Sequence, residues 1–158
     1  MPPVAVGAKA PDFTLNDSDN QPFTLSKLQG KNVVLAFFPA IFSGVCDREM
    51  CIFRDSMAGL NQVNATVVGV SADHRFGLKE FKAKHQLNFP LVSDWNREVI
   101  KKYGVEWPNF GGMPGYTAAT RSVFVLDKHG VVRWSWVTDA QGKEPDYAAV
   151  KSAVADLK

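Results

Sequence analysis

The chain has 158 residues, of which 46% are hydrophobic and 22% charged, and this composition is typical of one globular domain spanning residues 1–158. Its formal net charge is only +2, and no basic stripe carries interleaved aromatic residues, so nucleic acid is not an expected partner. No apolar run approaches the ~20 residues of a membrane span, and the N-terminus lacks a signal-peptide pattern. We therefore expect a cytoplasmic protein without a membrane partner, whose two cysteines are reduced.

The first third of the chain alternates strand and turn signals. Residues 13–15 and 23–25 are short alternating runs on either side of a polar turn, which predicts a β-hairpin. Residues 26–30 end in a glycine and indicate a short helical turn. The continuous apolar run 33–38 predicts a fully buried central strand. A helical period then extends from Cys46 to Val63.

The middle of the chain continues the alternation. Residues 66–70 form the next apolar run, and Asp73 offers a helix cap. A helical pattern covers 76–85, an extended piece covers 89–94, and a second short helix is expected over 96–103.

The last third begins with residues 107–120, where glycines and prolines interrupt any period and predict a loop. Two strands, 121–126 and 131–137, follow as a hairpin, and a final helix begins at Pro145. Strand–helix–strand units imply parallel pairing, whereas the hairpin must add antiparallel strands. The expected fold class is therefore α/β, with a central mixed sheet flanked by helices and an N-terminal β-hairpin.

Cys46 is the residue on which the chemistry depends. It follows a buried strand and a turn, and it stands where the helical pattern begins. A helix N-terminus favours a thiolate, so we expect a lowered pKa for Cys46. Ser43 could donate a hydrogen bond to the sulfur or to a bound substrate, and Pro39 stiffens the turn. On spacing alone, a buried thiol that only packs explains Cys46 equally well.

Cys51 follows Cys46 by five residues. Inside a regular helix their Cα atoms would stand roughly 8–9 Å apart, whereas a disulfide requires less than about 7 Å. The two thiols can therefore bond only if the start of the helix unwinds, which suggests a switch rather than a stabilising link. A helix-core thiol is the alternative, and spacing alone favours it.

The pattern Pro39-x-x-x-Ser43-x-x-Cys46 resembles the peroxiredoxin active-site motif Pro-x-x-x-Thr/Ser-x-x-Cys. Ser43 stands where threonine is commoner, and the loop over residues 107–119 matches the family only weakly. The second cysteine, Cys51, is similar to that of the Q-type, or bacterioferritin-comigratory, subgroup. Further stretches that look like family landmarks occur in family order at residues 11–15, 28–31, 33–39, 69–73, 89–94, 102–105 and 121–127.

The resemblance implies a thiol peroxidase on a thioredoxin-like fold, with Cys46 as the peroxidatic and Cys51 as the resolving cysteine. Ser43 would bond the peroxide, and Pro39 would shield the pocket. Arg121 matches the family's active-site arginine, which lowers the thiolate pKa and orients the peroxide.

Two further residues have supporting roles in this interpretation. Glu49 falls where many family members carry a glutamate that holds the arginine. Phe42 could line the peroxide pocket, and burial without a function explains it equally well. The disulfide would be reduced by an external dithiol, which in the family is usually thioredoxin. Hydrogen peroxide and organic hydroperoxides are the expected substrates.

No cofactor or metal is expected, because the three histidines have no ligand spacing with one another or with the cysteines. A monomer or weak homodimer is expected.

Two alternative functions remain open. A thioredoxin-type oxidoreductase shares the fold but uses Cys-x-x-Cys, and a non-enzymatic peroxide sensor or holdase would act by unfolding the helix around Cys46.

Overall fold

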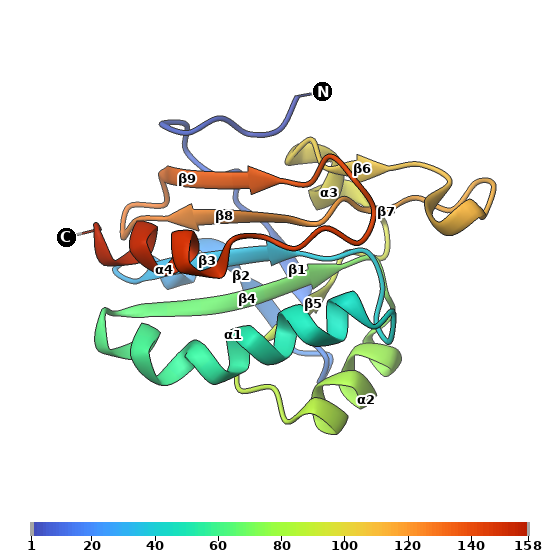
Figure 1. Ribbon diagram of the computed structural model, residues 1–158, viewed down its shortest axis with the longest axis horizontal. Helices are drawn as coiled ribbons and strands as arrows, with labels where there is room; N and C mark the ends of the chain where they lie inside the picture. Colours follow the sequence, from blue (N-terminus) through green and yellow to red (C-terminus); the bar gives the residue numbers. More distant parts are fainter. Residues whose placement is uncertain (1, 158) are drawn as a thin grey trace.

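The computed structural model describes residues 2–157, and a five-stranded sheet of order β5-β4-β3-β8-β9 forms its centre (Figure 1). β3 (Asn32–Phe37), β4 (Ala65–Ser71) and β5 (Leu91–Ser93) run parallel. β8 (Ser122–Leu126) pairs antiparallel with β3, and β9 (Val132–Val137) pairs antiparallel with β8. The predicted central mixed sheet is therefore confirmed.

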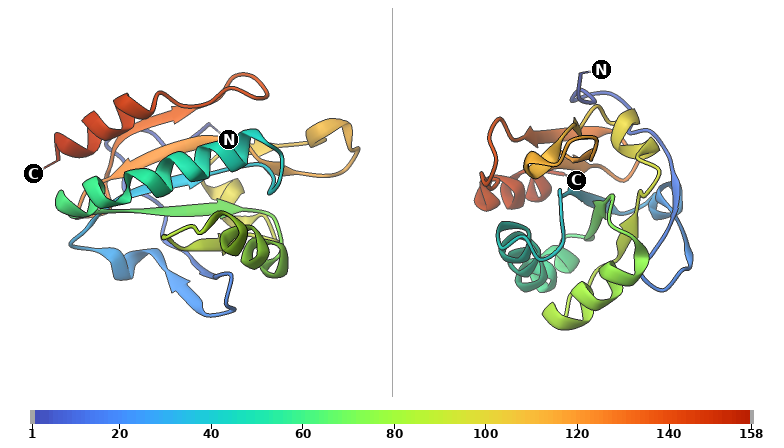
Figure 2. Two further views of the ribbon diagram at one scale, coloured as in Figure 1. Left: turned by 60° about the horizontal axis from the view of Figure 1, so that its bottom comes forward. Right: turned by 90° about the vertical axis from the view of Figure 1, so that its right-hand side faces the viewer.

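Helices cover both faces of this sheet. α1 (Val45–Gln62), α2 (Arg75–His85) and α4 (Tyr147–Ala155) pack on one face, as the two views in Figure 2 show. The opposite face is covered by α3 (Glu98–Lys102), the 3-10 turn η1 (Leu25–Leu28) and the N-terminal segment. No helix among residues 2–157 combines the length and apolar character needed to cross a membrane.

The central position of β3 explains its unbroken apolar sequence. Val34 and Ala36 point into the core beneath α1, whereas Val33, Leu35 and Phe37 point into the core on the other face. A strand that is buried on both faces has no exposed side, so the apolar/polar alternation typical of half-exposed strands is absent.

The predicted N-terminal hairpin is present as β1 (Thr14–Asn16) and β2 (Pro22–Thr24), which form a two-stranded sheet of their own. The Asp17 carboxylate accepts two backbone N–H groups from within the turn and so fixes its shape. An isolated bridge between Asp17 and Val92 places the hairpin beside β5, at the edge of the central sheet.

The region over 107–120 is more ordered than the predicted loop. β6 (Glu106–Trp107) pairs antiparallel with β7 (Ala118–Ala119), and a short 3-10 turn, η2 (Phe110–Gly112), lies between them. Two-residue strands are too short to show a hydrophobic period, and their pairing is set by contacts between residues twelve or so apart in the chain. The sequence pattern therefore could not reveal this small sheet.

The predicted cap of α2 is wrong. His74, not Asp73, is the N-cap, and its imidazole accepts the backbone N–H of Gly77 at 3.1 Å. The Asp73 carboxylate instead accepts the backbone N–H of Ile41 at 3.0 Å and the hydroxyl of Ser71 at 2.9 Å. Asp73 thus holds the loop after β3 against the end of β4, a long-range role that a local cap rule does not anticipate.

Two helix starts also differ from the prediction. α3 begins at Glu98 rather than residue 96, and the Asp94 carboxylate accepts backbone N–H groups of its first turn. α4 begins after Asp146, which caps it by accepting the N–H of Ala149 at 3.1 Å, so Pro145 lies just outside the helix.

Candidate active site

Cys46 lies in the first turn of α1, and its side chain is fully buried. The chain leaves β3 at Phe37 and turns sharply before the helix begins. Phe42 and Gly44 both adopt positive φ angles, of 58° and 82°, and Gly44 is the N-cap. A positive φ is unfavourable for a phenylalanine, so the local backbone is held in a strained form by its surroundings.

Arg121 is brought to Cys46 by the sheet. The antiparallel register pairs Ser122 with Phe37, which leaves Arg121 beside the segment that follows β3. Its guanidinium donates from Nη2 to Cys46 Sγ at 3.1 Å and from Nη1 to Glu49 Oε1 at 2.8 Å. Cys46 and Glu49 are three residues apart on one face of α1, so a single guanidinium fork reaches both. All three side chains are buried.

Ser43 lies at the turn before the helix. Its Oγ accepts the backbone N–H of Cys46 at 3.4 Å. Arg121 donates the hydrogen bond to the sulfur itself. Ser43 and the backbone of Ala40 act with Arg121 to lower the pKa of the thiol.

A hollow of about 80 Å³ opens beside Arg121. Its lining is mixed and includes Arg121 as well as Trp107 and Phe110, whose rings pack edge to face at 5.4 Å. The lining residues are Pro39, Ser43, Val45, Trp107, Phe110, Arg121, Thr138, Ala140, Gln141 and Gly142. The region 107–119 thus walls the hollow, a role for which its sequence gave no signal beyond two aromatic residues in a glycine-rich stretch.

Phe42 does not take the predicted place in this lining. Its side chain is 45% exposed, and its ring packs against Phe81 and His85 of α2, with centroid distances of 5.2 and 6.3 Å. The positive φ of Phe42 turns the ring toward α2, whereas the neighbouring Ser43 borders the hollow.

The predicted lowering of the Cys46 pKa is wrong in direction. Complete burial raises the pKa of the thiol, and Arg121, Ser43 and the Ala40 N–H oppose this rise without cancelling it. The sequence showed the helix N-terminus and the arginine, but it could not show that the thiol is desolvated.

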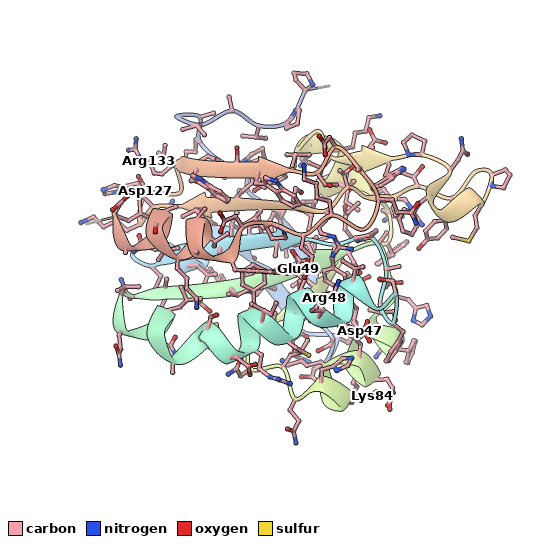
Figure 3. All side chains as sticks on the ribbon, viewed as in Figure 1. Asp47, Arg48, Glu49, Lys84, Asp127 and Arg133 are labelled. Atoms are coloured by element: carbon pink, nitrogen blue, oxygen red, sulfur yellow. The ribbon has the colours of Figure 1, made fainter. Side chains whose placement is uncertain are left out.

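Glu49 is the second perturbed group of the site. Burial raises the pKa of Glu49 to about 7, against the opposing effect of Arg121. Its Oε2 atom is buried and has no hydrogen-bond partner. Figure 3 shows Glu49 on the side of α1 that faces the sheet. The Arg121–Glu49 pair therefore changes its charge near neutral pH.

Cys51 lies one and a half turns further along α1 and is partly exposed. Both cysteines are free thiols, and both belong to one uninterrupted helix. Helical geometry separates their Cα atoms by roughly 8–9 Å, more than the about 7 Å that a disulfide tolerates. A bond between them requires the helix to unwind between residues 46 and 51.

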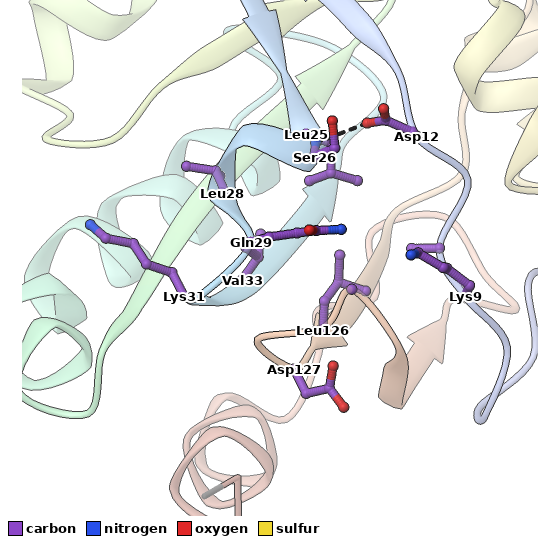
Figure 4. Close-up of a pocket in the computed structure, with 12 residues that line it drawn as sticks. Lys9, Asp12, Leu25, Ser26, Leu28, Gln29, Lys31, Val33, Leu126 and Asp127 are labelled. Atoms are coloured by element: carbon purple, nitrogen blue, oxygen red, sulfur yellow. Dashed lines mark hydrogen bonds between the residues drawn. The ribbon is translucent and has the colours of Figure 1, made fainter.

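Other parts of the described chain offer no comparable chemistry. No cluster of three or more His, Cys, Asp or Glu side chains within residues 2–157 is arranged to hold a metal ion. A second cavity, of about 40 Å³, lies near η1 and the loop around Asp127 (Figure 4). It borders Val33 at the start of β3, the end of that strand opposite to the Cys46 loop, and contains no thiol.

The fold and the site define a thioredoxin-like α/β protein with a buried thiol bonded by an arginine. A family model described as the AhpC/TSA family matches residues 6–135. The chain belongs to this family, and its recognition as a peroxiredoxin of the Q type is confirmed by its relatives. One is the chloroplast peroxiredoxin Q of Oryza sativa subsp. japonica, 42% identical over 131 residues, which are 83% of this chain and 58% of that protein.

Two solved structures support the fold prediction. A peroxiredoxin-like protein from Aquifex aeolicus superposes with a TM-score of 0.88 at 28% identity, covering 100% of this chain and 90% of the other. Peroxiredoxin Q from Xanthomonas campestris superposes with a TM-score of 0.78 at 27% identity, covering 90% and 89%. The chain spans little more than half the length of the plant relative, so activity and partners are proposals for this chain.

Proposed function

We propose that this protein is a thiol peroxidase that reduces hydrogen peroxide and organic hydroperoxides at Cys46. The observation that carries the proposal is the Arg121 fork, which bonds both the buried thiol of Cys46 and the carboxylate of Glu49 beside an open hollow. A cation that bonds the sulfur stabilises the thiolate and can also bond a peroxide oxygen.

The first step is nucleophilic attack. The Cys46 thiolate attacks one oxygen of the peroxide R–O–O–H, the O–O bond breaks, and a Cys46 sulfenic acid forms. The leaving alkoxide or hydroxide takes up a proton to become an alcohol or water. Arg121 stabilises the negative charge as it moves from sulfur to the leaving oxygen, while Ser43 bonds the peroxide and Pro39 limits access of water.

The second step is resolution. The Cys51 thiol attacks the Cys46 sulfur, a disulfide forms, and the hydroxyl of the sulfenic acid leaves as water. An external dithiol such as thioredoxin then reduces the disulfide and is itself oxidised. Support for this step comes from the similarity to relatives named peroxiredoxin Q, whose subgroup the second cysteine resembles, and from the partial exposure of Cys51.

The lining of the hollow supports organic hydroperoxides as substrates. Trp107, Phe110 and Val45 offer apolar surface next to the guanidinium of Arg121. An organic group can rest on these side chains while the peroxide oxygens meet Arg121 and Ser43. Hydrogen peroxide needs only the polar side of the hollow.

The test is peroxide consumption with thioredoxin, thioredoxin reductase and NADPH as the electron source. Wild-type protein should turn over, Cys46→Ser should be inactive, and Cys51→Ser should consume about one equivalent of peroxide before it stops. Full turnover by Cys46→Ser would disprove the assignment.

The cytoplasmic location and the monomeric or weakly dimeric state stay predictions. The relative from rice is named as a chloroplast protein.

A further inference from the structure

Two buried carboxylate oxygens in the described chain have no hydrogen-bond partner, Asp47 Oδ1 and Glu49 Oε2, and both lie between the two cysteines. Buried polar groups are normally bonded, and an unbonded one disfavours the conformation that buries it. A Cys46–Cys51 disulfide requires the helix to unwind between these residues. In its helical form this same segment leaves two buried polar atoms without a hydrogen bond.

Two contacts hold this segment in place from opposite sides. Toward the sheet, Glu49 bonds Arg121, as described above. Toward α2, Asp47 Oδ2 meets His85 Nε2 at 3.0 Å (Figure 3 shows Asp47 on this side of α1). The side chains of His85 and Asp47 are 18% and 25% exposed, so solvent screens this pair less than an open surface pair.

His85 also makes a second contact with α1. Its backbone carbonyl accepts Nη1 of Arg54 at 2.7 Å, and Asn88 donates to the carbonyl of Arg54 at 3.4 Å. Asp47, Cys51 and Arg54 follow at four- and three-residue spacing, so they share the face of α1 that looks toward α2. The end of α2 thus contacts α1 on both sides of Cys51.

We propose that Asp47 and His85 are a positioning pair that sets the rate at which Cys51 reaches Cys46. The inference rests on the proposed function. The Asp47–His85 contact must break when the helix unwinds between the cysteines, whereas the Arg54 contact lies beyond Cys51 and holds the rest of α1 in place. The pair acts on the resolving step through the helix and touches neither the peroxide nor the sulfur.

Breaking one such contact shifts the unwinding equilibrium by about three- to tenfold. His85→Leu fills the space between Phe42 and Phe81 with an apolar side chain and removes the contact. Asp47→Asn removes the charge from the other partner. Because an acidic residue in a first turn also favours the helix by itself, the double variant is needed to isolate the contact. Lys84→Ala is the matched control, since it truncates the neighbouring α2 side chain, whose ammonium lies 5.6 Å from the centroid of the Phe42 ring, outside the segment 46–51.

The first measurement uses the reduced protein without peroxide. Amide hydrogen exchange over residues 46–51 should accelerate about three- to tenfold in His85→Leu and in Asp47→Asn. The acceleration in the double variant should be smaller than the product of the two single effects, because both substitutions remove the same contact. Lys84→Ala should exchange like wild type. Unchanged exchange in both single variants, or strictly additive effects in the double variant, would overturn the proposal.

The second measurement separates the two chemical steps after rapid mixing with peroxide. The rate of sulfenic acid formation, which depends on peroxide concentration, should stay within about twofold of wild type in His85→Leu. The concentration-independent rate of disulfide formation should rise by the same factor as the exchange. Faster exchange with an unchanged disulfide rate would overturn the positioning role. If wild-type protein fails to react with peroxide, the proposed function fails, and the exchange measurement alone decides whether the contact restrains the helix.

Discussion

The carboxylates in the first turns of α1 and the carboxylate in the turn at Asp127, all labelled in Figure 3, differ in how completely they are hydrogen-bonded. Asp127 Oδ1 accepts the backbone N–H groups of His129 and Val131, and its Oδ2 accepts Nε of Arg133, so both oxygens are bonded. Asp47 and Glu49 each keep one buried oxygen without a partner. A fully bonded carboxylate fixes a turn in one shape, whereas an incompletely bonded one favours a segment that can change shape.

The pKa shifts follow the same division. Partial burial alone would raise the pKa of Asp127, but the hydrogen bonds from Val131, Arg133 and His129 outweigh it and lower the pKa. Burial dominates at Glu49 and raises its pKa to about 7. The two turns therefore respond to pH in opposite directions, and this difference can be tested by substitution.

The largest effect is expected from Arg121→Lys. Lysine keeps the positive charge but lacks the planar guanidinium fork that reaches Cys46 and Glu49 from two separate nitrogens. Because the donor to the reacting sulfur is lost, the second-order rate of Cys46 oxidation should fall by about 100-fold. Stopped-flow mixing with peroxide measures this rate. Arg133→Lys makes the same change at the Asp127 turn and should leave the rate unaltered; equal losses in both variants would remove the distinction between the two turns.

The next effect is the pH dependence of stability at Glu49. Its pKa of about 7 in the folded protein exceeds the ordinary 4.5, so the folded state binds the proton more tightly. The free energy of unfolding should therefore fall as the pH rises from about 4.5 to about 7, by up to about 3 kcal/mol. Glu49→Gln, which cannot ionise, should flatten this slope in urea unfolding curves.

Asp127→Asn provides the opposite case. The lowered pKa of Asp127 stabilises the folded state above the ordinary value of 3.8, and this contribution is lost as the pH falls through the folded-state pKa. The substitution should therefore destabilise the protein at neutral pH and have less effect in strong acid. Parallel pH profiles for Glu49→Gln and Asp127→Asn would contradict the assigned shifts.

A smaller effect is expected at the wall of the hollow. Trp107→Ala removes apolar surface that faces Arg121, so the catalytic efficiency for a bulky organic hydroperoxide such as cumene hydroperoxide should fall by about tenfold. The efficiency for hydrogen peroxide should change by less than about twofold. Trp95→Ala is the control, because Trp95 is 59% exposed and does not line the hollow. Equal losses for both peroxides would mean that Trp107 supports the fold rather than the substrate.

The smallest effect is expected at Phe42. Its ring is 45% exposed and packs on α2 outside the hollow, so Phe42→Ala should lower peroxide reactivity by less than about twofold. Steady-state rates with either peroxide measure this change. A large loss would mean that Phe42 contributes to the reaction despite lying outside the hollow.

The sequence predicted what is local or carried by a motif. The apolar run before Pro39, the helix after Cys46 and the final hairpin each follow from hydrophobic period and turn residues. The resemblance named Arg121 and Glu49. The sheet register brings Arg121 to Cys46, and Glu49 shares one face of α1 with Cys46. The sequence could not predict what depends on desolvation or on distant contacts: the raised pKa of Cys46, the capping role of His74, the wall formed by Trp107, and the contact between Asp47 and His85.

The most direct test of the account is the intact mass of the protein after one equivalent of peroxide. We predict that the mass falls by two hydrogens and that no free thiol remains, because Cys46 and Cys51 form a disulfide once the helix between them unwinds. Cys51→Ser should instead gain one oxygen on Cys46. A wild-type protein that keeps a stable Cys46 sulfenic acid and a free Cys51 would contradict the account.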